Sequence, residues 1–396
     1  MPNLVKVFAV LFFCLEVFGA VPVKAQQSPT PTSTPEIPVR LFMSALIDTY
    51  YSFNFTNNAH GLNGAGNTGY FPDTQQDDTL NINMFELGFT LKEGEGSAHV
   101  SIIGGEVANY FESLAGATSP GDNIVPYEVY VAYHPQDWTF TLGRMEPYLG
   151  FEVLETNQNW NYSRSLLFAV TLPSYFPGLS MNYTSPDNFI GLTGYAFNGL
   201  NDAIFSVPLS QGKTYGLKLN LNPSADWQWT LMGITGPTSG VNVPPASDDV
   251  FAHYIAEVIA QWTASDKISL ALDGEFIGQN PSGSQEFYSY GAALYFRCQW
   301  APDWATALRL EGLRINGPSP VLLYSGSAEL PMVPNDEGGE ITLTLEHNFT
   351  RKFLGRLEGR YDYALNGGNT FAPGTGPFAG GDPDQMTVTA SVVFSN

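Results

Sequence analysis

The stretch KFLGRLEGRYDY, residues 352–363, decides the fold class of this chain. Its odd-numbered positions are apolar or glycine, whereas its even-numbered positions from Arg356 to Asp362 alternate in charge. Successive side chains of a β-strand point to opposite faces of the sheet. The stretch therefore predicts a strand with one apolar and one charged face, and the same period of two recurs in residues 303–313 and 339–349.

Connections between such stretches alternate in length along the chain. The short ones are residues 93–96, 134–137, 184–187, 222–226, 263–267, 301–303 and 350–351. The long ones are residues 56–78, 112–124, 145–177, 199–212, 236–249, 278–285, 315–338 and 365–384. A soluble antiparallel sheet also alternates in side-chain character, but a β-sandwich has no reason to keep this order of connections. The pattern predicts an all-β transmembrane antiparallel β-barrel of about 16 strands, with short periplasmic turns and long extracellular loops.

Tryptophan gives an independent sign of a barrel in a membrane. Five tryptophans stand at or beside the short connections: Trp138, Trp227, Trp262, Trp300 and Trp304. Amphipathic aromatic rings gather at membrane–water interfaces, so this placement predicts a periplasmic aromatic girdle. The alternative is a set of core tryptophans in a β-sandwich.

Composition excludes several classes of protein. Only 14% of the residues are charged, against about 25% in ordinary soluble domains. The formal net charge of −22 repels nucleic acid, so no nucleic-acid partner is expected. No apolar run after residue 26 approaches the length of about 18 residues that a transmembrane helix requires.

The start of the chain has its own organisation. Residues 1–25 contain a lysine, an apolar run and an A-x-A-like site, which predicts a signal peptide. A membrane anchor is the alternative, but Glu16 interrupts the apolar run. Residues 26–39 are rich in proline and threonine and predict a periplasmic tether. Residues 40–396 form the predicted barrel.

Three segments carry a resemblance to a known family. They are DTYYSFNF at residues 48–55, NINMFELGFTLK at 81–92 and LGRMEPYLGFEVLETNQNWNYSRSLLF at 142–168. They resemble the OmpL-like family of β-barrel porins of the second type, and the resemblance extends over residues 40–394. It implies a bacterial outer-membrane location and pore architecture, without naming a transported solute. Expected partners are outer-membrane lipid, lipopolysaccharide, the barrel-assembly machinery and small solutes, with a homo-oligomer left open.

The polar face of each predicted strand supplies candidates for the lumen. An arginine or lysine facing lipid at the bilayer midplane costs about 2–4 kcal/mol, and a barrel of about 16 strands leaves an aqueous channel. The pore-lining candidates are Arg297, Arg309, Glu311, Glu346, Arg356, Glu358, Arg360, Asp362, Glu257, Asp273 and Glu275.

The arginines among these candidates allow two interpretations. In one, Arg309, Arg356 and Arg360 face acidic groups across a constriction and set up a transverse field. In the other, they form structural salt bridges with Glu311 and Glu358 in the wall. The acidic excess predicts a mild cation preference.

The long connection at residues 145–177 is the other candidate site. A constriction loop folded into the lumen is one interpretation, and an ordered extracellular cap is the alternative. Its candidate constriction residues are Glu152, Glu155, Trp160, Tyr162 and Arg164.

Signs of enzymatic chemistry are few. Residues 64–69 match G-x-G-x-x-G but precede no predicted helix, so the match is interpreted as a loop. The five histidines show no metal-ligand spacing, and no catalytic, metal or cofactor site is predicted. The sequence favours an outer-membrane porin for passive diffusion of small hydrophilic solutes or ions. A non-conducting structural or adhesive barrel and an outer-membrane enzyme remain the alternatives.

Overall fold

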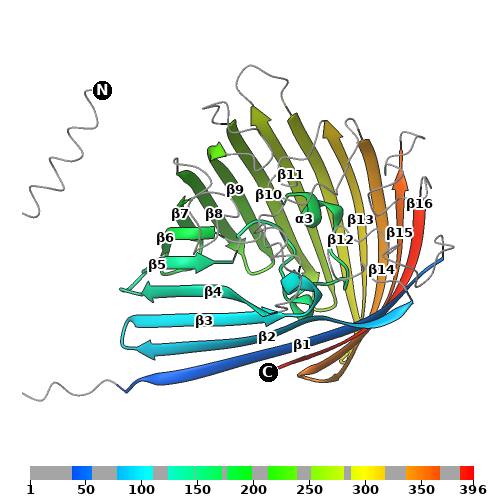
Figure 1. Cartoon of the computed structure of the whole chain (residues 1–396), viewed down its shortest axis with the longest axis horizontal. Coiled ribbons are helices and arrows are strands. Elements are labelled where there is room, and N and C mark those ends of the chain that lie inside the picture. Colours follow the sequence, from blue (N-terminus) through cyan, green and yellow to red (C-terminus); the bar gives the residue numbers. More distant parts are fainter. Residues whose placement is uncertain are drawn as a thin grey trace, which may run out of the picture. The chain divides into compact units, whose positions relative to one another are not determined.

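The computed structural model of this chain describes residues 38–55, 78–109, 124–146, 148–171, 176–198, 213–238, 251–280, 287–316, 336–365 and 384–396. Within these ranges, sixteen antiparallel strands close into a barrel (Figure 1). Each strand pairs with its neighbours in the sequence, and β1 pairs with β16. The predicted fold class is therefore confirmed.

The strand boundaries agree with the predicted pattern of connections. The strands are β1 Arg40–Asn54, β2 Thr79–Glu93, β3 Gly96–Gly104, β4 Ile124–Tyr133, β5 Trp138–Met145, β6 Phe176–Thr184, β7 Ile190–Phe197, β8 Thr214–Ser224, β9 Trp227–Thr238, β10 Phe251–Ser265, β11 Ile268–Asn280, β12 Phe287–Ala301, β13 Trp304–Asn316, β14 Asp336–Thr350, β15 Phe353–Ala364 and β16 Asp384–Ser395. Short turns join β2 to β3, β4 to β5, β6 to β7, β8 to β9, β10 to β11, β12 to β13 and β14 to β15, and longer connections join the other consecutive strands. The predicted signal peptide and the G-x-G-x-x-G loop lie outside the described residues.

Strand β15 shows why the sequence forms this wall. Arg356, Glu358, Arg360 and Asp362 are at most 8% exposed, whereas Leu357 between them is 52% exposed. The charged side chains at the even-numbered positions face the interior. The apolar side chains at the odd-numbered positions face outward, where lipid covers them in a membrane. The predicted assignment of faces is confirmed, and β13 shows the same alternation.

The tryptophans lie where the short turns begin and end. The rings of Trp227 and Trp262 stack with their centroids 5.4 Å apart, and those of Trp300 and Trp304 are 5.6 Å apart. Each pair joins neighbouring positions at the short-turn end of the barrel, and Trp227, Trp262 and Trp300 are 37–50% exposed. Aromatic side chains therefore ring part of this end.

Helical structure plays a small part in the described fold. The 3-10 helix η2 Thr156–Gln158 and the α-helix α3 Leu166–Thr171 both lie between β5 and β6. None of the helices among the described residues is long and apolar enough to cross a membrane. Figure 1 shows α3 beside the inner faces of β11, β12 and β13, which it contacts.

Candidate functional site

Residues 148–168, which we call the inward segment, leave the end of β5 and enter the barrel (Figure 1). Every residue from Asn161 to Phe168 is buried. Leu154, Leu166 and Leu167 belong to one apolar cluster with side chains of the wall, among them Ile103 of β3 and Leu313 of β13. The segment therefore packs against opposite sides of the barrel at once.

Gly150 turns the chain at the root of the inward segment. Its φ of 90° lies in the left-handed region, where glycine is favoured because it has no Cβ. In this conformation its N–H donates to both carboxylate oxygens of Glu257 on β10, at 2.9 and 3.1 Å. The next N–H, of Phe151, donates to Asp273 on β11 at 3.0 Å. Two acidic residues of the wall thus hold the root.

Two further glutamates each receive a pair of consecutive backbone N–H groups. Glu358 of β15 accepts from residues 162–163 at 2.6 and 2.9 Å. Glu311 of β13 accepts from residues 166–167 at 2.7 and 2.5 Å. Such hydrogen bonds contribute about 0.5–3 kcal/mol each, the larger values applying to a charged acceptor, so these clamps fix the far part of the segment to the wall.

Three arginines of the same wall bind the carbonyl oxygens of the segment. Their guanidinium groups donate from Arg309 to Ser163 (2.5 Å), from Arg356 to Thr156 and Asn159 (both 2.6 Å), and from Arg360 to Arg164 (2.6 Å). Carboxylates of the wall therefore accept hydrogen bonds from the N–H groups of the segment, and guanidinium groups donate hydrogen bonds to its carbonyl oxygens. An irregular backbone thus finds hydrogen-bond partners inside the barrel.

The arginines also pair with carboxylates. The ion pairs join Arg309 to Glu340 and to Glu152 (2.5 Å), Arg356 and Arg297 to Glu346 (3.0 and 2.7 Å), and Arg360 to Asp362 (2.7 Å). Arg309 and Glu340 are fully buried. Removing one partner of such a pair costs about 3–5 kcal/mol because the other charge stays buried without compensation. The arginines are thus engaged in a network of structural ion pairs.

The inward segment is also folded on itself. The guanidinium of Arg164 donates to the carbonyl oxygens of Val153 at 2.9 Å and Tyr162 at 2.8 Å, and it also binds that of Leu154. Asn159 exchanges two hydrogen bonds with the backbone of Val153, at 2.9 and 2.8 Å. The segment is therefore a compact body and not an extended strand.

Aromatic and polar contacts also hold the inward segment against the wall of the barrel. Tyr162 is fully buried and its hydroxyl lies 3.2 Å from Asp48 of β1. Trp160 packs against Phe151, with ring centroids 5.1 Å apart, and both rings lie near Tyr295 of β12. Three of the five predicted constriction residues, Glu152, Tyr162 and Arg164, are thus joined to the wall or to the segment by hydrogen bonds or ion pairs.

Glu155, also among the predicted constriction residues, belongs to a second group of acids that extends from the inward segment to strands β2 and β4. This group contains Glu86 of β2, Glu128 of β4, Glu146 and Glu155, which influence one another electrostatically. The N–H of Glu146 donates to Glu128 at 3.2 Å, and His99 lies 3.4 Å from Glu128. We call these four residues the acidic wall. In the described part of the chain, no arginine or lysine forms a salt bridge with them.

Two members of the acidic wall lie outside the strands. Burial raises the pKa of Glu155, and the Glu128 carboxylate adds to the increase. Burial likewise raises the pKa of Glu146 well above its ordinary value, and the charges of Glu155 and Glu128 raise it further. Both effects disfavour the charged form of a carboxyl group.

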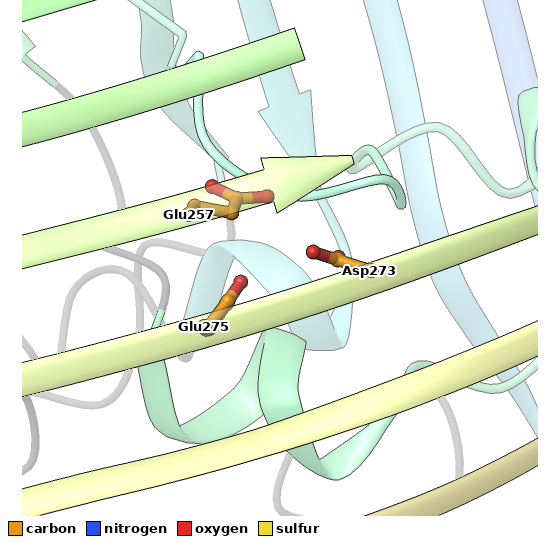
Figure 2. Close-up of side chains that lie close together, drawn as sticks. All are labelled: Glu257, Asp273 and Glu275. Atoms are coloured by element: carbon orange, nitrogen blue, oxygen red, sulfur yellow. The ribbon is translucent and has the colours of Figure 1, made fainter. Parts of the chain in front are cut away.

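A third acidic group lies at the root of the inward segment. Figure 2 shows the carboxylates of Glu257, Asp273 and Glu275 pointing toward one another from β10 and β11. One oxygen of each lies within 4.8 Å of the others, and all three residues are buried. This arrangement offers hard oxygen ligands of the kind that divalent cations bind.

The structure thus brings the candidates together in two places. One group surrounds the far part of the inward segment and consists of the arginines, Glu311, Glu346, Glu358 and Asp362. The other group lies at the root of the segment and consists of Glu257, Asp273 and Glu275. Sequence reasoning missed Gly150 and Ser163, whose backbone groups bind the wall. The glycine that precedes the segment's acidic residues was the available sign of a turn at this point.

The comparisons with known proteins agree with this architecture. Residues 40–395 match the model of the family described as "Putative beta-barrel porin-2, OmpL-like". Among curated proteins, no match was found.

Solved structures of outer-membrane barrels are similar in fold. The in-vitro folded OmpT, an outer membrane protein of Vibrio cholerae in its trimer form, has a TM-score of 0.59 at 7% identity, covering 90% of this chain and 99% of that one. The anion-selective porin from Comamonas acidovorans has a TM-score of 0.58 at 10% identity, covering 91% and 100%. The outer membrane channel DcaP of Acinetobacter baumannii has a TM-score of 0.54 at 12% identity, covering 90% and 97%.

Identities this low show the fold alone, whereas the family model covers almost the whole barrel. The interior charges, the apolar outer parity and the tryptophans at the short turns are the features expected of such a protein in a membrane. This chain belongs to the OmpL-like family of β-barrel porins and is a protein of the bacterial outer membrane.

Proposed function

We propose that this porin is a passive diffusion channel for small hydrophilic solutes or ions, and that the inward segment narrows its lumen. The observation that supports the proposal is the position of the inward segment against the inner wall of the barrel. Its backbone is bonded to the inner faces of β10, β11, β13 and β15. A cap above the rim would not reach the inner faces of four strands, so the contacts support a constriction within the barrel.

We further propose a mild cation preference. The arginines of the wall are compensated by carboxylates and by backbone carbonyls of the segment. The acidic wall forms no salt bridge with an arginine or lysine in the described part of the chain, although Arg164 and Lys218 attract Glu155 and Glu146 electrostatically. Its negative field would favour cations that pass through the lumen beside it, by the argument that applies to acidic rings in channels.

Planar-bilayer recording of the refolded protein tests both statements. We expect discrete conductance steps and a reversal potential of the cation-selective sign in a salt gradient. At a pH high enough to ionise Glu155, Glu155→Gln should reduce the preference, because it then removes a charge from the acidic wall. Glu337→Gln is the matched control, since Glu337 pairs with the outward Arg314 at 2.6 Å. An anion-selective reversal potential would contradict the preference.

Two alternatives are separated by the same recording. A structural or adhesive barrel would give no conductance steps, and an enzyme would show hydrolytic activity in detergent that depends on lumen acids. No contact among the described residues favours either. A homo-oligomer is also proposed, supported by the solved barrel described as a trimer form. Contacts with lipopolysaccharide and the assembly machinery stay predictions.

A further inference from the structure

The inward segment covers one side of the barrel interior and leaves another side open. Asp273 of β11, Glu311 of β13 and Glu358 of β15 bind the segment and are only 3%, 5% and 2% exposed. Glu128 of β4 and Lys218 of β8 also face the interior, but both are only half-buried. In the described part of the chain, the open part of the lumen therefore borders β4 and β8.

Lys218 lies near the root of the inward segment. The preceding residue on β8, Leu217, is 55% exposed on the outer face, so Lys218 faces inward. In the strand register Lys218 is opposite Met232 of β9, which is opposite Glu257 of β10. Glu257 accepts the N–H of Gly150. The ammonium group of Lys218 thus enters the lumen two strands away from the point where the segment is bound to the wall.

Lys218 differs from the arginines of the interior because it has no bonded partner. Arg309 and Arg356 form ion pairs with carboxylates. Lys218 forms neither a hydrogen bond nor a salt bridge in the described part of the chain, although Glu257 and Glu146 attract it electrostatically. Its ammonium group can therefore bind an anionic group of a solute.

The acidic wall borders the same open part of the lumen. Glu128, one of its members, is half-buried, and Glu146, another member, attracts Lys218. Strands β6 and β7 lie between β4 and β8 and contain no charged residue. On β7 the ring of Tyr195 stacks on that of Tyr148, with centroids 3.7 Å apart. Acidic groups and one ammonium group thus flank the neutral stretch of wall formed by β6 and β7.

Opposite charges on two sides of a passage orient a solute that carries both signs. A carboxylate of the solute would face Lys218, and its ammonium group would face the acidic wall. The low dielectric constant of the surrounding protein strengthens both attractions. The acids repel a solute that carries only a negative charge, and Lys218 repels one that carries only a positive charge.

We propose that Lys218 and the acidic wall together make this channel favour zwitterionic solutes, which carry an ammonium group and a carboxylate. Lys218 is the specificity-determining residue, because it supplies the positive side of the passage. The inference rests on the proposed diffusion channel and names the class of solute that the channel favours. It agrees with a mild cation preference for ions, because the four acids of the wall outnumber the single ammonium group.

Swelling of liposomes that contain the refolded full chain tests the inference. Glycine betaine is the zwitterionic probe, because its quaternary ammonium group stays charged at every pH. Erythritol is a neutral probe of similar size, and neither probe carries a net charge across the membrane. At a pH high enough to ionise the acidic wall, betaine should enter faster than erythritol.

The variants of Lys218 measure its contribution to this difference. Lys218→Met should lower the ratio of the two rates by about two- to fivefold, as expected for the loss of a partly exposed charge contact. Lys218→Arg keeps the positive charge and should retain most of the ratio. Lys213→Met is the matched control, because Lys213 is exposed before the start of β8, where it donates to Asn198 at 2.7 Å. It should leave the ratio unchanged.

A second measurement uses the unaltered protein, so it does not depend on the variants folding. Added salt screens charges over about 10 Å at 0.1 M, so the ratio should fall as salt is raised. A ratio that is insensitive to salt, or that stays the same in Lys218→Met, would overturn the inference. Both results leave the proposed diffusion channel intact as long as erythritol enters, whereas exclusion of both probes would contradict the channel itself.

Discussion

The guanidinium of Arg309 lies 2.5 Å from the carboxylate of Glu152, and this ion pair joins strand β13 to the inward segment inside the barrel. Arg309 is fully buried and Glu152 is 3% exposed. Residues 157 positions apart in the sequence therefore share one desolvated contact. The charged side chains on the inner faces of the strands therefore bind the inward segment as well as lining the interior of the barrel.

Replacing Arg309 should strongly destabilise the protein. Arg309→Met leaves Glu152 buried without its cation and leaves Glu340 with only its longer pair to Arg360 at 3.5 Å. The free energy of unfolding should therefore fall by about 3–5 kcal/mol. Denaturant unfolding in detergent measures the loss. Arg314→Met is the matched control, because Arg314 is exposed and its surface pair with Glu337 contributes at most about 1 kcal/mol. Equal losses in the two variants would contradict the account.

The clamp at Glu358 should control the mobility of the inward segment. Glu358→Ala removes the acceptor of two backbone N–H groups, at residues 162–163, so their hydrogen exchange should accelerate. Glu358→Gln keeps an oxygen acceptor but loses the charge, so it should give a smaller acceleration. Unchanged protection in Glu358→Ala would show that the segment is held by other contacts.

Cation preference should increase with pH. The pKa values of Glu146 and Glu155 are raised by burial, so both stay protonated in a range where ordinary carboxyls are already charged. Raising the pH above 4.5, the ordinary glutamate value, therefore adds negative charge to the acidic wall. By the same linkage, the stability that these protonated groups contribute is lost as the pH rises through their raised pKa values.

Reversal potentials measured across a pH series check this prediction. The change with pH should be smaller in the Glu146→Gln, Glu155→Gln double variant than in the natural protein. A flat profile in the natural protein, or a preference that falls as the pH rises, would contradict it.

The tryptophans should differ in their access to lipid. Trp262 is 40% exposed at the short-turn end, whereas Trp160 packs against Phe151 inside the barrel. In single-tryptophan variants, lipids brominated near the headgroup should quench the fluorescence of Trp262 much more than that of Trp160. Equal quenching would contradict either the girdle or the inward position of the segment.

Much of the fold could be predicted because side chains that alternate along a strand point to opposite faces, so the two faces appear in the sequence as a pattern with a period of two. The buried Arg356 and the exposed Leu357 follow directly from that period. The short turns, with the tryptophans beside them, indicated which consecutive strands are neighbours in the sheet. A closed barrel then followed, since consecutive antiparallel strands with short turns pair with their neighbours.

The site could be predicted only as a set of residues. Periodicity places Asp273 and Glu275 on one face, but their meeting with Glu257 depends on the register between β10 and β11. The partners of Arg309 and Glu358 depend on a segment that shows no regular period. The backbone of that segment is satisfied by side chains distant in the sequence, and no local pattern encodes such pairing.

Single-channel conductance of a variant that lacks residues 155–165 tests the central claim most directly. The deletion removes the middle of the inward segment and retains Gly150 and Phe151 at its root. Heat-modifiable mobility on gels would establish that the variant still forms a barrel. If the segment narrows the lumen, the conductance of the variant should exceed that of the natural protein. An unchanged conductance in a folded variant would contradict the account.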